Sequence, residues 1–305
     1  MESLSWIPSS ALKIWTYRML GASIGNRVRI GRGSFIWSSN FKAVKIGDGV
    51  TIRDNTRFFC EMLTIEEDAY IESNGYVSGK EFFLGFGSYF GKNMYVDCTS
   101  PVRIEEKVAI SFTQIYTHSI AYAWVTSGIM KRNDAPVTIK EGSWLAPDLI
   151  IGAGVIIGEH ASVGARSLVL EDIAPYTLNF GIPCKKIRSI RNIFRQEQNL
   201  LDDVKRDLEG YVKCKHPKKT FQFIFHDIVA HHDLTLKQEK NFFLVGNHVD
   251  DSIFKKLISK KSKCASAFDL RRQLYFKNDS PLVHEIKHRM RRYGLIFKPY
   301  GARVD

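Results

Sequence analysis

The 305-residue chain is 44% hydrophobic and 25% charged, and its formal net charge is +12. This composition is typical of a globular protein, and the length allows a large core and two domains. No apolar run reaches the length of a membrane span, and the first ten residues lack the basic-then-apolar layout of a secretory signal.

The cysteines and the distribution of charge indicate the compartment and the kind of partner to expect. The five cysteines are scattered and never spaced C-x-x-C, which predicts free thiols in a reducing compartment and therefore a cytoplasmic protein. Residues 191–305 hold 24 Lys and Arg against 14 Asp and Glu, which leaves about +2 for the first 190 residues. The basic tail is either a solvated surface or a site for an anionic partner, such as an acidic polysaccharide, a membrane or a nucleic acid.

A short helix is predicted near the start, where Ser9 and Ser10 can cap a segment with Leu12, Trp15 and Met19 on one face. We expect this helix, within residues 1–22, to close the open end of a repeat domain, because terminal repeats need a cap. Contact with a membrane is the alternative use of this end of the chain.

From residue 24 onward, apolar anchors recur every six residues. A period of six fits neither a helix nor a hairpin, but it fits a coil of short parallel strands that each send one side chain to the axis. Three anchors make one triangular turn, so the sequence predicts a parallel β-helix of about seven turns. The anchors are Ile24, Ile30, Ile36, Ile46, Ile52, Phe58, Ile65, Ile71, Val77, Leu84, Phe90, Val96, Ile104, Ile110, Tyr116, Ile139, Leu145, Ile151, Ile157, Val163 and Val169.

The stretch from Ile139 to Val169 is the most regular part of this ladder. Gly152, Gly158 and Gly164 directly follow three of its anchors. We expect glycine at these corners because the backbone there is left-handed or crowded.

One break in the ladder is long, with 22 residues between Tyr116 and Ile139. A loop of this length inside a compact repeat is usually functional or disordered. The chain enters it directly after Thr117 and His118, and His118 is one of only two histidines before residue 191. His118 is therefore the first candidate for chemistry.

Beyond Val169 the period ends, and residues 172–176 should turn the chain off the coil into a helical stretch reaching residue 204. A small, basic α/β domain is predicted over 195–305, with strands at 221–225, 242–245 and 295–298 and helices at 251–261 and 281–293. Histidines and aspartates at 226–227 and 231–233 could suggest a metal site. Their spacing matches no known ligand set, so we expect no metal.

Several of these motifs together carry a resemblance. Thr117-His118, Trp144, Gly164-Ala165, the exit at 172–176 and the Gly-Ile-Pro-Cys-Lys-Lys-Ile-Arg segment ending at Arg188 resemble hexapeptide-repeat acetyltransferases. The branch most similar is that of galactoside, maltose and polysaccharide O-acetyltransferases, over roughly residues 10–190. The resemblance implies a left-handed β-helix over 23–190, a homotrimer, and acetyl-CoA as co-substrate in the groove between neighbouring coils.

The resemblance also assigns roles to residues around the catalytic groove. It places His118 at the family's catalytic histidine, and imidazole is suited to take the proton of a sugar hydroxyl near neutral pH. Asn93 matches an acceptor-holding asparagine, and its alternative is a corner residue that tolerates left-handed backbone. Trp144 matches a tryptophan beside the groove, with plain packing as its alternative. His160 is interpreted as an exposed corner residue.

For acetyl-CoA, the resemblance places the backbone near Ala146 and Ala165 along the pantetheine arm. It places Lys185 and Arg188 at the nucleotide phosphates, with Lys186 as a third charge. Three places depart from the family pattern. Ile120 replaces a second histidine, Gly181-Ile182-Pro183-Cys184 replaces Gly-Asn-Pro-Ala, and residues 139–142 (Ile-Lys-Glu-Gly) replace the Ile-Gly before the tryptophan. These departures leave the identity of the acceptor open.

The sequence therefore predicts an acetyl-CoA-dependent O-acetyltransferase that modifies a sugar hydroxyl, such as that of a capsular or other bacterial surface polysaccharide. The alternatives are N-acetylation of an amino-sugar nucleotide and a catalytically silent scaffold for the basic domain. Expected partners are acetyl-CoA and a sugar or polysaccharide acceptor, with no nucleic acid and at most peripheral membrane contact. We expect residues 195–305 to hold an anionic acceptor near the groove.

Overall fold

The computed structural model describes residues 7–118, 134–191, 200–215, 222–229 and 242–249, and short stretches from 251 to 299 (251–252, 255, 264–269, 273–275, 283, 286–287, 290 and 297–299). The chain forms two compact units, Met1–Ile193 and Phe194–Asp305. In the described part of the chain, no helix has both the length and the apolar character needed to cross a membrane.

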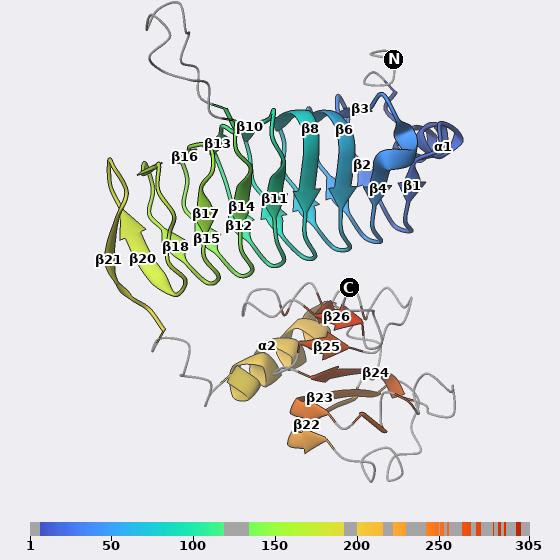
Figure 1. Cartoon of the computed structure of the whole chain (residues 1–305). Helices are drawn as coiled ribbons and strands as arrows, with labels where there is room; N and C mark the ends of the chain where they lie inside the picture. Colours follow the sequence, from blue (N-terminus) through green and yellow to red (C-terminus); the bar gives the residue numbers. More distant parts are fainter. Residues whose placement is uncertain are drawn as a thin grey trace, which may run out of the picture. The chain divides into compact units, whose positions relative to one another are not determined.

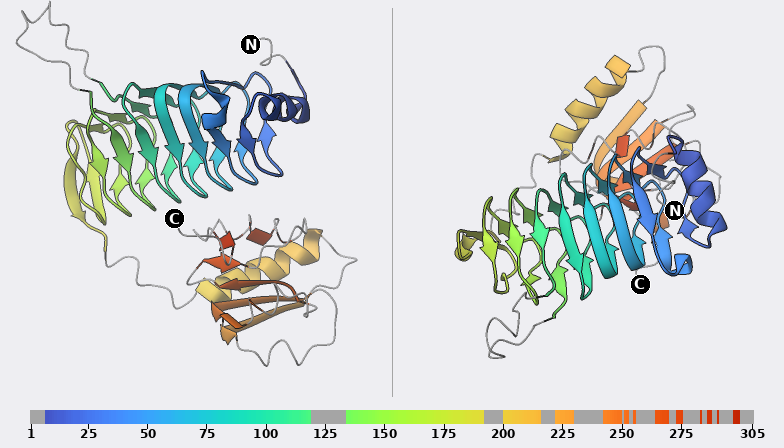
Figure 2. Two further views of the ribbon diagram at one scale, coloured as in Figure 1. Left: turned by 45° about the vertical axis from the view of Figure 1, so that its right-hand side comes forward. Right: turned by 90° about the horizontal axis from the view of Figure 1, so that it is seen from above.

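The first unit is a parallel β-helix of about seven turns, as the six-residue period predicted (Figure 1). Each turn has three faces, and each strand pairs in parallel with the corresponding strand of the next turn, which stacks the turns along one axis (Figure 2). In chain order, the first face holds β1 (Ser23–Ile24), β4 (Val44–Ile46), the ends of β6 (Arg57–Ile65) and β8 (Tyr76–Leu84), β11 (Val102–Ile104), β14 (Val137–Ile139) and β17 (Ile156–Ile157).

The second face is a separate sheet of two-residue strands, continued at its end by an antiparallel pair. It holds β2 (Arg29–Ile30), β5 (Thr51–Ile52), β7 (Tyr70–Ile71), β9 (Tyr89–Phe90), β12 (Ala109–Ile110), β15 (Trp144–Leu145), β18 (Ser162–Val163), β20 (Thr177–Phe180) and β21 (Lys185–Ser189). The third face holds β3 (Phe35–Trp37), the starts of β6 and β8, β10 (Tyr95–Cys98), β13 (Gln114–Ile115), β16 (Ile150–Ile151) and β19 (Leu168–Val169). A short 3-10 helix, η2 (Phe41–Ala43), precedes β4.

The core is the column of side chains along the axis of the β-helix. Every anchor expected from the sequence is buried there except Tyr116. Ile115 takes that place, because the corner after Ile110 is one residue shorter than the others, and it aligns with Val96 and Ile151 on the neighbouring turns. Tyr116 instead points outward, with its ring centroid 5.7 Å from that of Tyr95.

The sequence predicted that corner glycines provide left-handed backbone or relieve crowding, and in the structure different residues serve these two purposes. Gly152, Gly158 and Gly164 do not have positive φ. Backbone crowding requires glycine at Gly158, where a Cβ would lie 2.5 Å from the Pro175 nitrogen, whereas a Cβ on Gly152 or Gly164 would meet the side chain of Leu170 or Phe180 first. Left-handed backbone is instead supplied at corner positions such as His160 (φ 51°).

Helix α1 (Ser10–Met19) covers the N-terminal end of the β-helix, but with a face other than the predicted one (Figure 1). Lys13 and Tyr17 are fully buried, whereas Leu12, Trp15 and Met19 are exposed. Lys13 and Tyr17 face inward because the first turn has no preceding turn to pair with. Its free backbone N–H and C=O groups need hydrogen bonds, and these side chains of α1 provide them.

The second unit contains a five-stranded sheet in the order β22 (Gln222–Val229), β23 (Phe242–Val249), β24 (Cys264–Asp269), β25 (Leu274–Tyr275) and β26 (Lys298–Pro299). Helix α2 (Leu200–Lys215) starts later than the helix expected after the coil, because strand β21 occupies 185–189. Residues 231–233 of the possible metal motif lie outside the described residues. Among the side chains that are described, no group of three His, Cys, Asp or Glu could hold a metal ion.

Candidate active site

The site centres on the third corner, which joins the third face of one turn to the first face of the next. After β13 the chain reaches His118, which forms an isolated antiparallel bridge with Asp134. The Ala135 N–H also donates to the Thr117 carbonyl over 2.9 Å. The two ends of the long loop are thus fixed together at His118, and residues 119–133 of the loop lie outside the described part of the chain.

His118 is paired with a carboxylate that the sequence had not singled out. Its Nδ1 lies 2.5 Å from Oδ2 of Asp97, at the equivalent corner of the preceding turn. The side chains of His118 and Asp97 are 24% and 11% exposed, so the pair is partly open at the histidine and nearly closed at the carboxylate.

A network of hydrogen bonds fixes Asp97 in this position. Oδ1 accepts from the Thr99 backbone N–H (3.1 Å) and the Thr99 hydroxyl (2.7 Å), and Oδ2 accepts from the Thr117 N–H (3.3 Å). The Thr117 hydroxyl donates to the Asp97 carbonyl (3.0 Å) and accepts from the Ser100 N–H (2.9 Å). Thr117 therefore ties the two turns together beside the His118–Asp97 pair.

This network determines the ionisation of Asp97. Burial by itself would raise the pKa of Asp97, but the hydrogen bonds from Thr99 and His118 outweigh it and hold this pKa below its usual value. Asp97 is therefore an acceptor at neutral pH, so the proton between the two groups belongs to Nδ1 of His118. That tautomer leaves the Nε2 lone pair as the basic position of the ring.

A histidine with an oriented ring and a basic Nε2 can remove a proton from a hydroxyl group. The sequence contained a signal for its partner: Asp97 directly follows the anchor Val96, as Tyr116 follows Ile115 one turn later. A search for polar residues one turn before His118 would have found it.

Asn93 lies at the other end of β10 from Asp97, on the second corner. Its backbone is left-handed (φ 52°), and its Oδ1 accepts a hydrogen bond from the Asn74 amide over 3.2 Å. The corner role that was the alternative for Asn93 therefore accounts for its position, and the structure does not bring it to His118 within one chain.

The residues matched to acetyl-CoA gather on another side of the β-helix. Trp144 projects from β15 on the second face and is 53% exposed. Ala146 is buried at the adjacent second corner, and Ala165 is exposed at the same corner one turn later. The second face is the side opposite the third corner in each triangular turn, so one chain does not bring Trp144 and His118 together.

Strand β21 continues this second face with positive charge. Lys185, Lys186 and Arg188 are all exposed, and β21 pairs antiparallel with β20 through Phe180 and Lys185, Asn179 and Lys186, and Leu178 and Arg188. A ring of Phe180 fills the space over Gly164, where a Cβ would clash with it. The second face thus ends in a solvent-facing basic strand.

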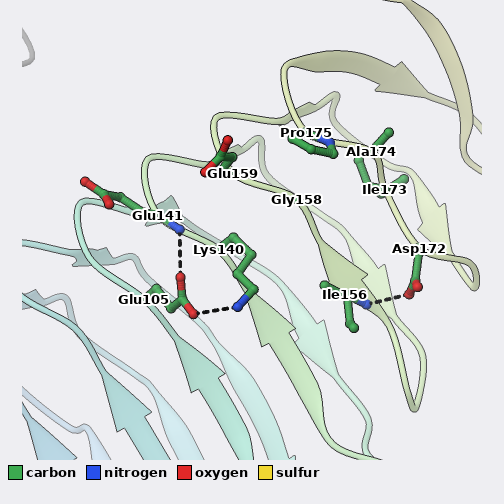
Figure 3. Close-up of a pocket in the computed structure, with 10 residues that line it drawn as sticks. All are labelled: Glu105, Lys140, Glu141, Ile156, Gly158, Glu159, Asp172, Ile173, Ala174 and Pro175. Carbon is green, nitrogen blue, oxygen red and sulfur yellow. Dashed lines mark hydrogen bonds and ion pairs between the residues drawn. The ribbon is translucent and has the colours of Figure 1, made fainter.

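A separate pocket of about 640 Å³ lies on the first face, near the first corner, and neither His118 nor Asp97 lines it (Figure 3). Its polar walls are held by internal bonds: Glu105 pairs with Lys140 over 2.9 Å, and Asp172 accepts from the Ile156 N–H over 2.7 Å. Glu141 and Glu159 also line it. This acidic lining is unsuited to the phosphates of a nucleotide.

Comparison with known proteins finds sequence relatives that are named as acetyltransferases. The galactoside O-acetyltransferase of Escherichia coli is 29% identical over 136 residues, which cover 42% of this chain and 64% of that enzyme, less than two thirds of its length. A Schizosaccharomyces pombe protein named as an acetyltransferase is 29% identical over 156 residues, covering 48% of this chain and 73% of its own length. This similarity to acetyltransferases agrees with the resemblance carried by the sequence motifs. No family model matches the chain.

Two solved structures are similar to part of this chain. A hexapeptide-repeat acetyltransferase from Vibrio cholerae matches 62% of this chain and 85% of its own, with 20% identity and a TM-score of 0.34. The N-acyltransferase AntD from Bacillus cereus, solved with dTDP and 3-hydroxybutyryl-CoA, matches 63% of this chain and 96% of its own, with 21% identity and a TM-score of 0.42.

Proposed function

We propose that the protein is an acetyl-CoA-dependent O-acetyltransferase that modifies a sugar hydroxyl, with His118 as general base. The observation that carries the proposal is the His118–Asp97 pair at the point where the long loop leaves the coil. The sequence relative in Escherichia coli, a galactoside O-acetyltransferase, supports the choice of a sugar hydroxyl as acceptor.

The pair performs the chemistry in the following way. Nε2 of His118 takes the hydroxyl proton while the hydroxyl oxygen forms a bond to the thioester carbonyl carbon. The carbon–sulfur bond then breaks, the sulfur leaves with the bonding electrons, and the proton held on Nε2 passes to it. Asp97 stays ionised and stabilises the imidazolium that exists between the two proton transfers.

The co-substrate fits the second face and its basic edge. Lys185, Lys186 and Arg188 are exposed cations suited to its phosphates, and the exposed Ala165 permits close approach of the pantetheine arm. Trp144 would flank the groove. Because these residues lie opposite the corner that carries His118, a complete site needs the second face of another copy, which supports the expected homotrimer.

A narrower proposal names the compartment and the kind of acceptor. We place the enzyme in the cytoplasm, acting on a capsular or other bacterial surface polysaccharide or its precursor; the thiols of Cys60 and Cys98, which are free and buried, fit a reducing compartment. The basic second unit would raise the local concentration of an anionic glycan. A chain ending near residue 195 should then show a higher KM for anionic polymer, and the difference should shrink as salt is raised.

A thiol-release assay with acetyl-CoA tests the reaction class. We expect release of CoA with hydroxyl sugars and an acetyl ester in the product, measured by mass spectrometry. Faster transfer to the amino group of an amino-sugar nucleotide would assign the protein to N-acetylation instead. Absence of transfer to every acceptor, with acetyl-CoA bound, would support a scaffold.

A further inference from the structure

Helix α1 holds Leu12, Trp15 and Met19 away from the protein. On its inner side, Lys13 Nζ donates to the carbonyls of Gly31 (2.7 Å) and Ser34 (3.0 Å), and the Tyr17 hydroxyl accepts from the Ile36 N–H (3.0 Å). Breaking these bonds would leave buried polar groups without partners, which is unfavourable. The helix therefore cannot rotate to bury its other side.

The outer side of α1 is apolar and exposed. Leu12 is 46%, Trp15 60% and Met19 70% exposed, and the adjoining Leu20 is 44% exposed. Trp15 and Met19 are large side chains whose exposure on a single helix face is unusual for a surface that contacts only water. The arrangement is that of a helix that lies in a membrane interface, with large apolar residues on one side.

Charge is segregated along the β-helix in the same direction. Residues 7–60, which include α1 and most of the first two turns, hold nine Lys and Arg against two Asp and Glu, whereas residues 61–118 hold four against nine. The near-zero net charge of the repeat domain thus hides a basic end and an acidic middle. The exposed basic residues at this end are Arg18, Arg27, Arg29, Arg32, Lys42, Lys45, Arg53 and Arg57.

The two acidic residues of this end are occupied by the backbone. Asp48 Oδ1 accepts from the Asn26 N–H and Asp54 Oδ1 from the Arg32 N–H, both over 2.8 Å. Neighbouring turns lie about 4.8 Å apart, so the charges of the first two turns lie within roughly 10 Å, about one Debye length, of the end of the coil.

We propose that this end of the β-helix binds the surface of an anionic phospholipid bilayer, with Leu12, Trp15 and Met19 of α1 in the headgroup region. The basic side chains of the first two turns attract the anionic headgroups. The β-helix axis then points away from the membrane. Such docking would bring the enzyme to acceptors held at a membrane.

Vesicle co-sedimentation of the full chain tests the proposal. Native protein should bind vesicles that contain phosphatidylglycerol more tightly than pure phosphatidylcholine vesicles. The triple variant Leu12→Gln, Trp15→Gln and Met19→Gln should bind at least about tenfold more weakly at high salt, where the basic second unit is screened and burial of apolar area dominates. Melting temperatures should remain close to native, because the replaced side chains are exposed and glutamine favours helix.

A matched triple variant at the opposite end serves as the control. Leu170, Ile182 and Ile187 are 58%, 74% and 60% exposed, and their replacement by glutamine should leave vesicle binding unchanged. The proposal is overturned if native protein does not bind the anionic vesicles, or if the α1 variant binds them as native protein does. It is also overturned if light scattering without vesicles shows that only the α1 variant dissociates, which would make this face a contact between copies. Acetyl transfer is not measured, so the result is independent of the proposed function.

Discussion

The second and third corners of the β-helix turn the same chain in different ways. In each turn, the corner between the second and third faces contains one residue with left-handed backbone. From the second turn onward, the N–H of this residue bonds to the turn before, as Asn93 N–H does to Ser73 O (3.1 Å). The third corners vary: β6 and β8 continue through them, whereas the next two hold the Asp97–Ser100 segment and the long loop.

This difference explains where chemistry can be placed. At a regular corner, a side-chain bond such as that from the Arg32 N–H to Asp54 Oδ1 joins residues at the same place in successive turns. At the irregular corner, side chains of Asp97, Thr99 and Thr117 satisfy the backbone of two successive turns, and the same bonds orient His118. The proposed chemistry thus lies where the repeat departs from its period.

The largest effect should follow removal of the base at the irregular corner. His118→Ala should lower kcat by about 10²–10⁴-fold, because general-base catalysis is lost. The control is His160→Asn at a regular corner, where asparagine tolerates the left-handed backbone. CoA release should be near native in this control, and an equal loss in both variants would remove the distinction between the corners.

A smaller loss should follow from removing the charge that orients the base. Asp97→Asn should lower kcat by about 10–10²-fold with little change in the KM for acetyl-CoA, because an amide can favour the wrong tautomer of His118. Steady-state kinetics separate the two parameters. A change confined to KM would place Asp97 in binding rather than in positioning.

Mixing two defective variants tests whether a site is shared between copies. His118→Ala lacks the third-corner base, and the triple variant Lys185→Ala, Lys186→Ala and Arg188→Ala lacks the basic edge of the second face. Co-assembly should restore about a quarter of native activity at low acetyl-CoA, because that fraction of random interfaces pairs the two intact halves. Activity no higher than that of the separate variants would place each site within one copy.

The smallest effect concerns stability in acid. The pKa of Asp97 is lowered in the folded protein, so its stabilisation is complete above the usual carboxyl range and is lost as pH falls through the lowered value. Asp97→Asn should cost about 1.5–3 kcal/mol at neutral pH, the worth of hydrogen bonds to a charged group. Thermal unfolding of both proteins across pH should show the difference shrinking in acid; a constant difference would contradict this account.

The sequence predicted the regular part of the molecule because every turn needs the same apolar side chains at the axis of the coil, and these recur every six residues. It missed Ile115, since a single corner lacks one residue. It also missed the orientation of α1, since Lys13 and Tyr17 hydrogen-bond to backbone groups of the first turn, and a hydrophobic period gives no sign of such bonds. It predicted a role for His118 beside the long loop, but it gave no role to Asp97, which lies one turn away from His118. The separation of Trp144 from His118 required the three faces to be seen together.

The central claim, that His118 accepts the hydroxyl proton, is tested most directly by chemical rescue. His118→Gly removes the imidazole and leaves space where added imidazole can take its place beside Asp97. We predict that acetyl transfer to the sugar by this variant is very slow and rises with imidazole concentration, with the same acetylated product by mass spectrometry. Transfer by His118→Gly at the native rate without imidazole would contradict the claim.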